Sequence, residues 1–198
     1  MIAVIDYKAG NLTSVMKALH AVGADALATS DPEVVTKADR LVLPGVGHFS
    51  ATSFLEERGL KSAIEQRIQA GVPFLGICVG LQWLFEGSTE SPQTSGLGVF
   101  SGRCQRFGTE LKVPHVGWNS VTVSDAKLMH GIESGAFVYY THSFFAPVVN
   151  ETVAVTEYGV PFTAAVERGN VMGVQFHPEK SGPTGVRVLE NFVRLSAC

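Results

Sequence analysis

The sequence has little cysteine, no block of basic residues and no long apolar run. Its three cysteines make an odd number, and no two of them form a C-x-x-C pair. A disulfide framework or a zinc knuckle is therefore not expected, which favours the reducing cytoplasm. The 15 lysines and arginines are mixed along the chain with 18 aspartates and glutamates, so nucleic acid is not an expected partner.

The amino-terminal stretch also lacks the features of a targeting segment. Asp6 and Lys8 interrupt its apolar residues early, and no basic region precedes them. No apolar run reaches the ~20 residues that a membrane span requires. At 45% hydrophobic residues the chain can bury a substantial core, and no repeat or linker divides it. We therefore expect a single domain over residues 1–198.

Strand and helix patterns alternate in the first half and predict a three-layer α/β fold with a mostly parallel sheet. Apolar runs predict strands over residues 1–5, 24–28 and 40–43 and one that begins at Pro73. Helical spacing of apolar residues predicts helices over 12–22 and 54–70.

Short β segments dominate after residue 87 and predict an antiparallel extension of the sheet. The predicted strands lie at residues 97–100, 121–123, 137–140, 153–156, 163–166 and 171–176. A final amphipathic helix is predicted over 185–195. The stretch from Pro114 to Asn119 is interpreted as a glycine-containing loop.

The strongest chemical signal is the sharp turn Gly76-Ile77-Cys78-Val79-Gly80 between a predicted strand and an apolar helix. This is the G-x-nucleophile-x-G elbow, with a cysteine as the nucleophile. Glycines are needed because the strained turn leaves no room for flanking side chains. The helix N-terminus would favour the thiolate of Cys78. A buried structural cysteine between two packing glycines is the alternative that this pattern alone leaves open.

A base for Cys78 is predicted near the end of the chain. His177 and Glu179 follow a strand at i, i+2 spacing, so both side chains leave the same side of an extended segment. A nucleophilic cysteine needs a base for its proton and an acceptor that holds the base in one tautomer. His177 and Glu179 suit these two tasks. The competing bases are His48, His115 and His142, and a structural histidine beside a solvated carboxylate is the alternative.

The turn Pro44-Gly45-Val46-Gly47 has two interpretations. Its glycines would let backbone N–H groups face an anion, either a phosphate or an oxyanion. The sequence has no Walker lysine and no G-x-G-x-x-G, which disfavours nucleotide binding. On these residues alone a plain tight turn is favoured.

Together the motifs resemble the class I, or triad, glutamine amidotransferases. The segments from Gly76 to Gln82 and from Phe176 to Glu179 carry this resemblance. It narrows to the glutaminase subunits of imidazole glycerol phosphate synthase, enzymes of histidine biosynthesis. The segments that narrow it are Asp6-Tyr7-x-x-Gly10-Asn11, Pro44 to Gly47, Pro114-His115-x-Gly117-Trp118-Asn119, Thr141-His142-Ser143 and His177 to Ser181. The flavodoxin-like amidotransferase fold is implied.

The resemblance implies that Cys78 attacks the side-chain amide of glutamine while His177, oriented by Glu179, moves the protons. Ammonia leaves, and water hydrolyses the γ-glutamyl thioester to glutamate. Backbone donors for the oxyanion are expected from Gly45, Val46, Gly47 and Val79, with a peptide reorientation in the 45–47 loop. No metal and no cofactor are expected.

The resemblance also implies binding residues and a partner. The positions that match glutamine contacts are Gln82, Glu90, His142 and Ser143. The positions that match partner contacts are Asn11, Trp118, Asn119, Tyr139 and Lys180. The implied partner is a (β/α)8-barrel cyclase subunit, joined in a heterodimer, which receives ammonia through an internal passage. It makes imidazole glycerol phosphate and the aminoimidazole carboxamide ribotide. From the residues alone, a Trp-Asn pair is equally a structural cap of a loop.

Two rival functions stay open from the sequence. Another triad glutaminase, serving anthranilate, aminodeoxychorismate or pyridoxal phosphate synthesis, is disfavoured by the segment from Pro114 to Asn119 and by Lys180-Ser181. A catalytically idle flavodoxin-like scaffold would keep the elbow only as architecture. The presence of a cysteine, a histidine and a glutamate at spacings that fit triad roles argues against it.

Overall fold

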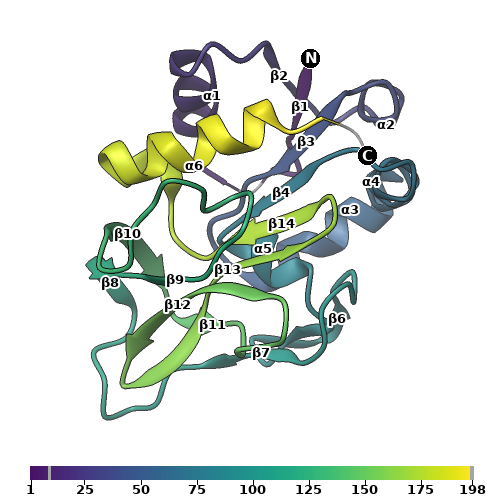
Figure 1. Ribbon diagram of the computed structural model, residues 1–198. Helices are drawn as coiled ribbons and strands as arrows, with labels where there is room; N and C mark the ends of the chain where they lie inside the picture. Colours follow the sequence, from purple (N-terminus) through teal and green to yellow (C-terminus); the bar gives the residue numbers. More distant parts are fainter. Residues whose placement is uncertain (9, 197–198) are drawn as a thin grey trace.

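The computed structural model describes residues 1–8 and 10–196 and has one large sheet (Figure 1). Its eight strands run in the order β2-β1-β3-β4-β14-β13-β12-β9. The first five are parallel, and the last three are added in antiparallel fashion. The strands are β1 (Ile2–Ile5), β2 (Ala26–Thr29), β3 (Arg40–Leu43), β4 (Phe74–Ile77), β9 (Thr122–Val123), β12 (Thr152–Tyr158), β13 (Val160–Arg168) and β14 (Val171–Val174). The predicted α/β class with a mostly parallel sheet and an antiparallel extension is confirmed.

Helices cover both faces of the parallel strands. Helices α1 and α6 lie side by side on one face, and α3 and α4 lie on the other (Figure 1). The helices are α1 (Leu12–Ala21), α2 (Pro32–Val35), α3 (Ser53–Glu57), α4 (Leu60–Gln69), α5 (Val79–Trp83) and α6 (Gly182–Arg194), with 3-10 turns η1 (Phe49–Thr52) and η2 (Pro178–Lys180). Every residue of β1, β4 and β14 is buried, as expected for parallel strands covered on both faces.

Two small sheets complete the second half of the chain. One pairs β8 (His115–Ser120) with β10 (Phe137–His142) in antiparallel fashion. The other has the order β11-β7-β5-β6, with β5 (Gly87–Ser88), β6 (Ser91–Ser95), β7 (Arg103–Arg106) and β11 (Phe144–Phe145). The prediction of a loop from Pro114 to Asn119 was wrong, because residues 115–120 form β8.

Two further predictions were wrong in detail. The helix predicted over 54–70 is split, because Gly59 takes a left-handed φ of 70° between α3 and α4. Only glycine adopts this conformation freely. Residues 97–100 form no strand. The backbone N–H groups of Leu97 and Phe100 instead donate to the carbonyl oxygens of Trp83 and Leu84. This segment therefore satisfies carbonyl groups at the end of α5.

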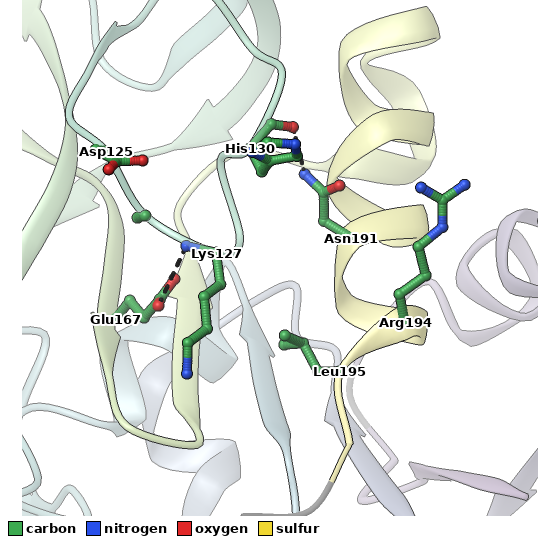
Figure 2. A pocket seen from close by; sticks show the side chains of 8 residues that line it. Asp125, Lys127, His130, Glu167, Asn191, Arg194 and Leu195 are labelled. Atoms are coloured by element: carbon green, nitrogen blue, oxygen red, sulfur yellow. Dashed lines mark hydrogen bonds between the residues drawn. The ribbon is translucent and has the colours of Figure 1, made fainter.

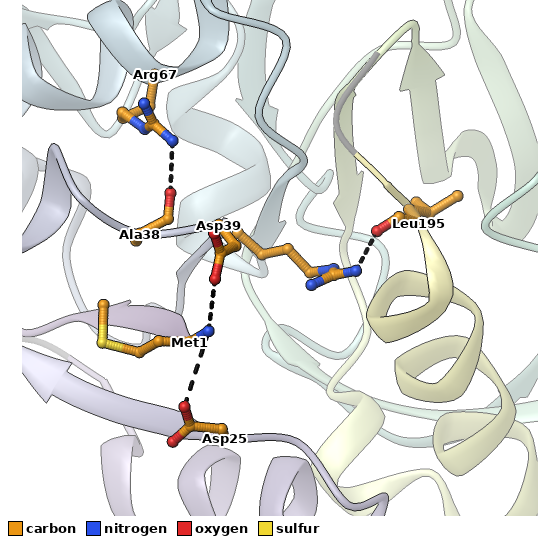
Figure 3. A network of polar contacts seen from close by, with 7 residues as sticks. Met1, Asp25, Ala38, Asp39, Arg67 and Leu195 are labelled. Atoms are coloured by element: carbon orange, nitrogen blue, oxygen red, sulfur yellow. Dashed lines mark hydrogen bonds and ion pairs between the residues drawn. The ribbon is translucent and has the colours of Figure 1, made fainter.

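Both ends of the described chain contact the start of β3, at the amino ends of the parallel strands (Figure 3). The Met1 ammonium donates to Asp39 at 2.7 Å and lies 3.8 Å from Asp25. Its hydrogen bond and charge lower the pKa of Asp39 below the usual value. Arg40 donates to the carbonyl of Leu195, which ties α6 to β3. The predicted site residues lie at the opposite, carboxyl ends of these strands, the usual place for a site in an open α/β sheet.

Candidate active site

The predicted nucleophile lies where β4 ends and α5 begins. Cys78 has φ 55° and ψ −105°, a backbone conformation that a residue with a side chain rarely adopts. Its N–H donates to the carbonyl oxygen of Val174 at 2.7 Å, which holds the strained turn against β14. Such strain at the tip of a strand is the geometry of a nucleophile elbow.

The two glycines of the elbow allow close backbone packing. A Cβ on Gly80 would overlap with the carbonyl oxygen of Leu43 on β3, and a Cβ on Gly76 would overlap with the carbonyl group of Gly80. Helix α5 therefore crosses β3 and β4 at a distance that only glycine permits.

The predicted base and its carboxylate partner lie beside each other after β14. His177 Nδ1 is 2.9 Å from Glu179 Oε1, and both side chains are 1% exposed. The carboxylate accepts the Nδ1–H, which leaves Nε2 for proton transfer. Nε2 is buried and has no hydrogen-bond partner among the described residues. A buried imidazole nitrogen without a partner is unusual in a structural histidine and expected in a general base.

The electrostatics of His177 favour a charged pair with the nucleophile. Burial by itself lowers the pKa of His177, but the Cys78 thiolate and the Glu179 carboxylate outweigh burial and raise the pKa to about 10. When the sulfur is a thiolate, the imidazole is therefore protonated across neutral pH. Such a pair holds both an active nucleophile and a proton donor for a leaving amine.

A cavity of about 220 Å³ opens onto the nucleophile. Its lining residues are Gly47, Cys78, Val79, Gln82, Glu90, Pro114, Thr141, His142, Ser143 and Phe144. All four residues predicted to contact glutamine are therefore brought together there. His177 and Glu179 do not line the cavity, and the predicted site residues did not include Pro114, Thr141 or Phe144. The size and the mixture of polar groups suit a small amino acid.

The predicted oxyanion donors are not arranged as a hole in this conformation. The N–H of Val79 donates to the carbonyl oxygen of Gly45 at 3.4 Å, so a carbonyl occupies the place of a donor. Gly47 has φ 104°, and a Cβ built on it would meet no atom within 4 Å. This end of the loop is therefore free to turn. At the other end, a Cβ on Gly45 would overlap with the Tyr7 hydroxyl.

The competing histidines are engaged elsewhere. His115 Nδ1 lies 3.1 Å from His142 Nε2, and His142 Nδ1 lies 2.8 Å from the carbonyl oxygen of Phe144. Because the carbonyl only accepts, His142 carries its proton on Nδ1 and accepts from His115. Burial lowers the pKa of His115 to about 4 and of His142 to about 3, so both are neutral. His48 is exposed, and its ring accepts the backbone N–H of Ser50 at 3.2 Å as a cap of η1.

Acidification should destabilise the protein, because the fold keeps His142 neutral. Its pKa is about 3 in the folded chain, against ~6.5 for an unfolded histidine. Between these values only the unfolded chain binds the proton. The free energy of unfolding should therefore fall as pH drops below ~6.5, by ~1.4 kcal/mol per pH unit from this group.

Urea unfolding between pH 8 and pH 4 measures this dependence. His142→Gln should give a shallower slope than the original chain. His130→Gln is the control, because His130 is exposed. An unchanged slope in His142→Gln would mean that the folded chain protonates His142 freely.

Three of the predicted partner-facing residues form one cluster. Trp118 on β8 pairs with Tyr139 on β10, and their rings meet edge to face with centroids 6.0 Å apart. Lys180 Nζ lies 5.7 Å from the centre of the Tyr139 ring. Asn119 points to the other face of β8, where its Nδ2 donates to the Glu157 carbonyl at 3.0 Å. Asn11 is the half-buried N-cap of α1 and lies apart from this pair of strands.

A larger cavity of about 470 Å³ lies between α6 and the loop after β9 (Figure 2). Its labelled side chains come from Asp125, Lys127, His130, Glu167, Asn191, Arg194 and Leu195. The Glu167 carboxylate accepts the backbone N–H groups of Lys127 and Leu128, and the Asn191 amide donates to the carbonyls of Leu128 and His130. These contacts fasten the loop to β13 and α6. No predicted site residue lines this cavity, so we place the candidate site at the elbow.

Residues 1–8 and 10–196 lack two further kinds of feature. No helix there is long and apolar enough to cross a bilayer. No cluster of three or more histidine, cysteine, aspartate or glutamate side chains there has a geometry that would hold a metal ion. Cys78 and Cys104 are free thiols, and Cys198 lies outside the described residues.

Known proteins share both the sequence and the fold. The family model of class-I glutamine amidotransferases matches residues 3–195. The chain is 50% identical to imidazole glycerol phosphate synthase subunit HisH of Methanothermobacter thermautotrophicus, over 98% of each chain. It is also 50% identical to that of Thermococcus kodakarensis, over 98% of this chain and 100% of the relative.

Solved structures extend the likeness to the fold. A glutamine amidotransferase crystal structure superposes with a TM-score of 0.78 at 20% identity, over 98% of this chain and 100% of the other. PurLQS from Thermotoga maritima gives 0.73 at 19% identity, over 96% of each chain. The chain therefore belongs to the class-I glutamine amidotransferase family, among the HisH subunits of imidazole glycerol phosphate synthase.

Proposed function

We propose that this chain hydrolyses L-glutamine to glutamate and ammonia and passes the ammonia to a cyclase subunit. The observation that carries the proposal is the buried pair His177–Glu179, with a histidine whose pKa is raised by Cys78, at a strained elbow beside a small polar cavity. The relatives that are 50% identical to this chain are subunits of imidazole glycerol phosphate synthase, which supports that partner. An idle scaffold would have no need for the coupled charges of Cys78, His177 and Glu179.

The cavity offers matching groups for a glutamine zwitterion. Glu90 supplies a negative charge for the α-ammonium group, while one of its oxygens accepts the N–H of Phe49 at 2.7 Å. Both Nε2 hydrogens of Gln82 are engaged, which leaves its Oε1 as an acceptor for substrate. Ser143 provides a hydroxyl donor for the carboxylate. These roles place the amide of glutamine toward Cys78.

The reaction then proceeds in two steps. The Cys78 thiolate attacks the amide carbon, and the His177 imidazolium gives its Nε2 proton to the departing nitrogen, so that ammonia leaves and a γ-glutamyl thioester remains. His177 next takes a proton from water, which attacks the thioester carbon. The thiolate is expelled as glutamate forms. Glu179 keeps the imidazole in one tautomer and stabilises its charge throughout.

The oxyanion of each tetrahedral intermediate requires a change in the loop after β3. The carbonyl of Gly45 now accepts from Val79, and it would face the oxyanion with the wrong charge. The C=O and N–H of one peptide point in opposite directions. Rotation of the Gly45–Val46 peptide would therefore remove this carbonyl, free the N–H of Val79 and turn the N–H of Val46 inward. The free chain should accordingly hydrolyse glutamine slowly.

We propose that the cyclase, a (β/α)8 barrel, docks on the outward face of the β8–β10 ribbon. Val116, Trp118 and Phe137 are each more than half exposed there, and Tyr139 lies between them in the register. A contiguous apolar and aromatic face of this kind is typical of an interaction surface. The heterodimer is proposed to act in the cytoplasm, where reducing conditions keep the Cys78 thiol free.

Replacing Trp118 by alanine should weaken this heterodimer. A buried interface tryptophan typically contributes ~2 kcal/mol or more, which corresponds to at least ~30-fold in Kd. Titration calorimetry with the cyclase measures the change. Leu27→Ala is the matched control, because Leu27 is similarly exposed but lies on β2 at the far edge of the sheet. Equal Kd values for the two variants would place the interface elsewhere.

Transfer of labelled nitrogen tests the proposed function. The complex of this chain with the cyclase is given glutamine that carries heavy nitrogen in its side-chain amide, in a buffer with excess unlabelled ammonium. We expect the imidazole product to contain the heavy nitrogen, because ammonia passes directly between the subunits.

An unlabelled product would show that ammonia escapes to solvent. A rate of glutamine hydrolysis that does not change when the cyclase is added would indicate that the chain serves another pathway. Absence of hydrolysis under every condition would support the scaffold alternative.

A further inference from the structure

A second glutamine lies against the nucleophile. Gln175 follows β14, has no exposed surface, and places Nε2 3.5 Å from the sulfur of Cys78. We propose that Gln175 donates a hydrogen bond to the Cys78 thiolate and so positions and stabilises the nucleophile. This inference rests on the proposed function, because it concerns the chemistry of the same site.

The surrounding hydrogen bonds fix which way the Gln175 amide points. Gln82 Nε2 lies 2.8 Å from the carbonyl oxygen of Phe144 and 3.2 Å from Gln175 Oε1. Because a carbonyl oxygen only accepts, the amide nitrogen of Gln82 must face Phe144. Its other hydrogen then requires an acceptor, which is Oε1 of Gln175. The NH₂ group of Gln175 is thereby turned toward Cys78.

The backbone on both sides holds this chain of amides in place. The N–H of Gln175 donates to the carbonyl oxygen of Ala164 on β13 at 2.8 Å. The carbonyl of Phe144, at the other end, also lies 2.8 Å from His142 Nδ1. Every link is buried or half-buried, and low exposure strengthens such bonds. The donor therefore meets the sulfur with little freedom to move.

A neutral amide donor has a definite effect on a sulfur nucleophile. An amide N–H cannot accept the thiol proton, so the contact stabilises the thiolate more than the thiol. The proton is left to His177. The sulfur loses its negative charge when the thioester forms and regains it when water expels the thiolate. Gln175 therefore assists formation of the nucleophile and its departure, without touching glutamine.

Alkylation of Cys78 by iodoacetamide tests this contact without substrate or partner. The full chain is alkylated at pH 7 and pH 9, and peptide mapping separates Cys78 from Cys104 and Cys198. Gln175→Glu keeps the acceptor for Gln82 and the side-chain length but places an oxygen opposite the sulfur. Gln175→Met removes both groups. Gln105→Glu, at an exposed position of β7, is the control.

We expect iodoacetamide to alkylate Cys78 of both Gln175 variants at least ~10-fold more slowly at pH 7, because a hydrogen bond to the charged sulfur is lost. The decrease in rate should be smaller at pH 9. In the complex, kcat for glutamine hydrolysis should fall ~10- to 100-fold while KM stays within ~3-fold. The control should resemble the original chain in every measurement.

Three results would contradict either the hydrogen bond from Gln175 to Cys78 or the proposed function, and they distinguish the two failures. Wild-type alkylation rates in a folded Gln175→Glu chain would overturn the proposed donor. Loss of thermal stability in Gln175→Met, with wild-type behaviour of Gln175→Glu, would make Gln175 a packing residue only. If Cys78→Ser in the complex hydrolyses glutamine as fast as the original chain, the proposed function fails instead.

Discussion

Replacing Cys78 by serine should lower glutamine hydrolysis by the complex by ~10⁴-fold or more. Serine keeps the shape of the elbow but places a hydroxyl, far harder to ionise than a thiol, beside His177. The charged pair that raises the pKa of His177 to about 10 would not form. Glutamate release at saturating glutamine, measured with the cyclase present, gives the change in kcat.

Cys104→Ala serves as the control for this substitution. Cys104 is also a buried free cysteine, but it does not line the cavity at the elbow. Its variant should hydrolyse glutamine at a rate close to that of the original chain. Substantial activity in Cys78→Ser, or equal losses in both variants, would mean that the nucleophile is not at the elbow.

Replacing Gly80 by alanine should lower the free energy of unfolding by at least ~3 kcal/mol. The new Cβ would overlap with the carbonyl oxygen of Leu43 on β3, a central strand whose backbone is held on both sides. No side-chain rotation relieves a clash with backbone. Helix α5 would have to move away, and the cavity beside Cys78 would change shape.

Gly23→Ala separates this steric effect from backbone strain. Gly23 has a φ of 78°, but a Cβ there would meet no atom within 4 Å. Its variant should lose only ~1–2 kcal/mol, the usual penalty of a left-handed residue. Urea unfolding of both variants gives the comparison. Equal losses would show that α5 does not pack closely against the backbone of β3 at Gly80.

The sequence predicted the parallel half of the fold well, because its signals are local. Apolar runs located β1, β3 and β4, and helical spacing located α1 and α6 within a few residues. The second half was harder. The sequence from His115 to Ser120 contains a glycine and an asparagine, yet it forms β8 because it pairs with β10, whose alternate residues Val138, Tyr140 and His142 are buried. Such pairing between distant segments outweighs local preference.

In the candidate site, too, local features could be predicted and contacts between distant segments could not. The elbow and the spacing of His177 and Glu179 are local patterns with a chemical meaning, and they could be predicted. Gln175 could not, since its contact with Cys78 depends on where β14 ends relative to β4. One signal was present in the sequence: Gln175 is a polar residue in the apolar stretch predicted as a strand over 171–176, two positions before His177. The hydrogen bond from Val79 to Gly45 could not be predicted from the sequence either, because it depends on which conformation the 45–47 loop adopts.

Capture of the acyl intermediate on Cys78 tests the central claim most directly. The complex turning over glutamine is quenched in acid, digested and analysed by mass spectrometry, with Cys78→Ser treated in parallel. We predict that the peptide containing Cys78 carries one glutamyl group in the original chain, and that the corresponding peptide of the variant carries none. Glutamine hydrolysis without a glutamyl group on Cys78, or with one on another residue, would contradict the account.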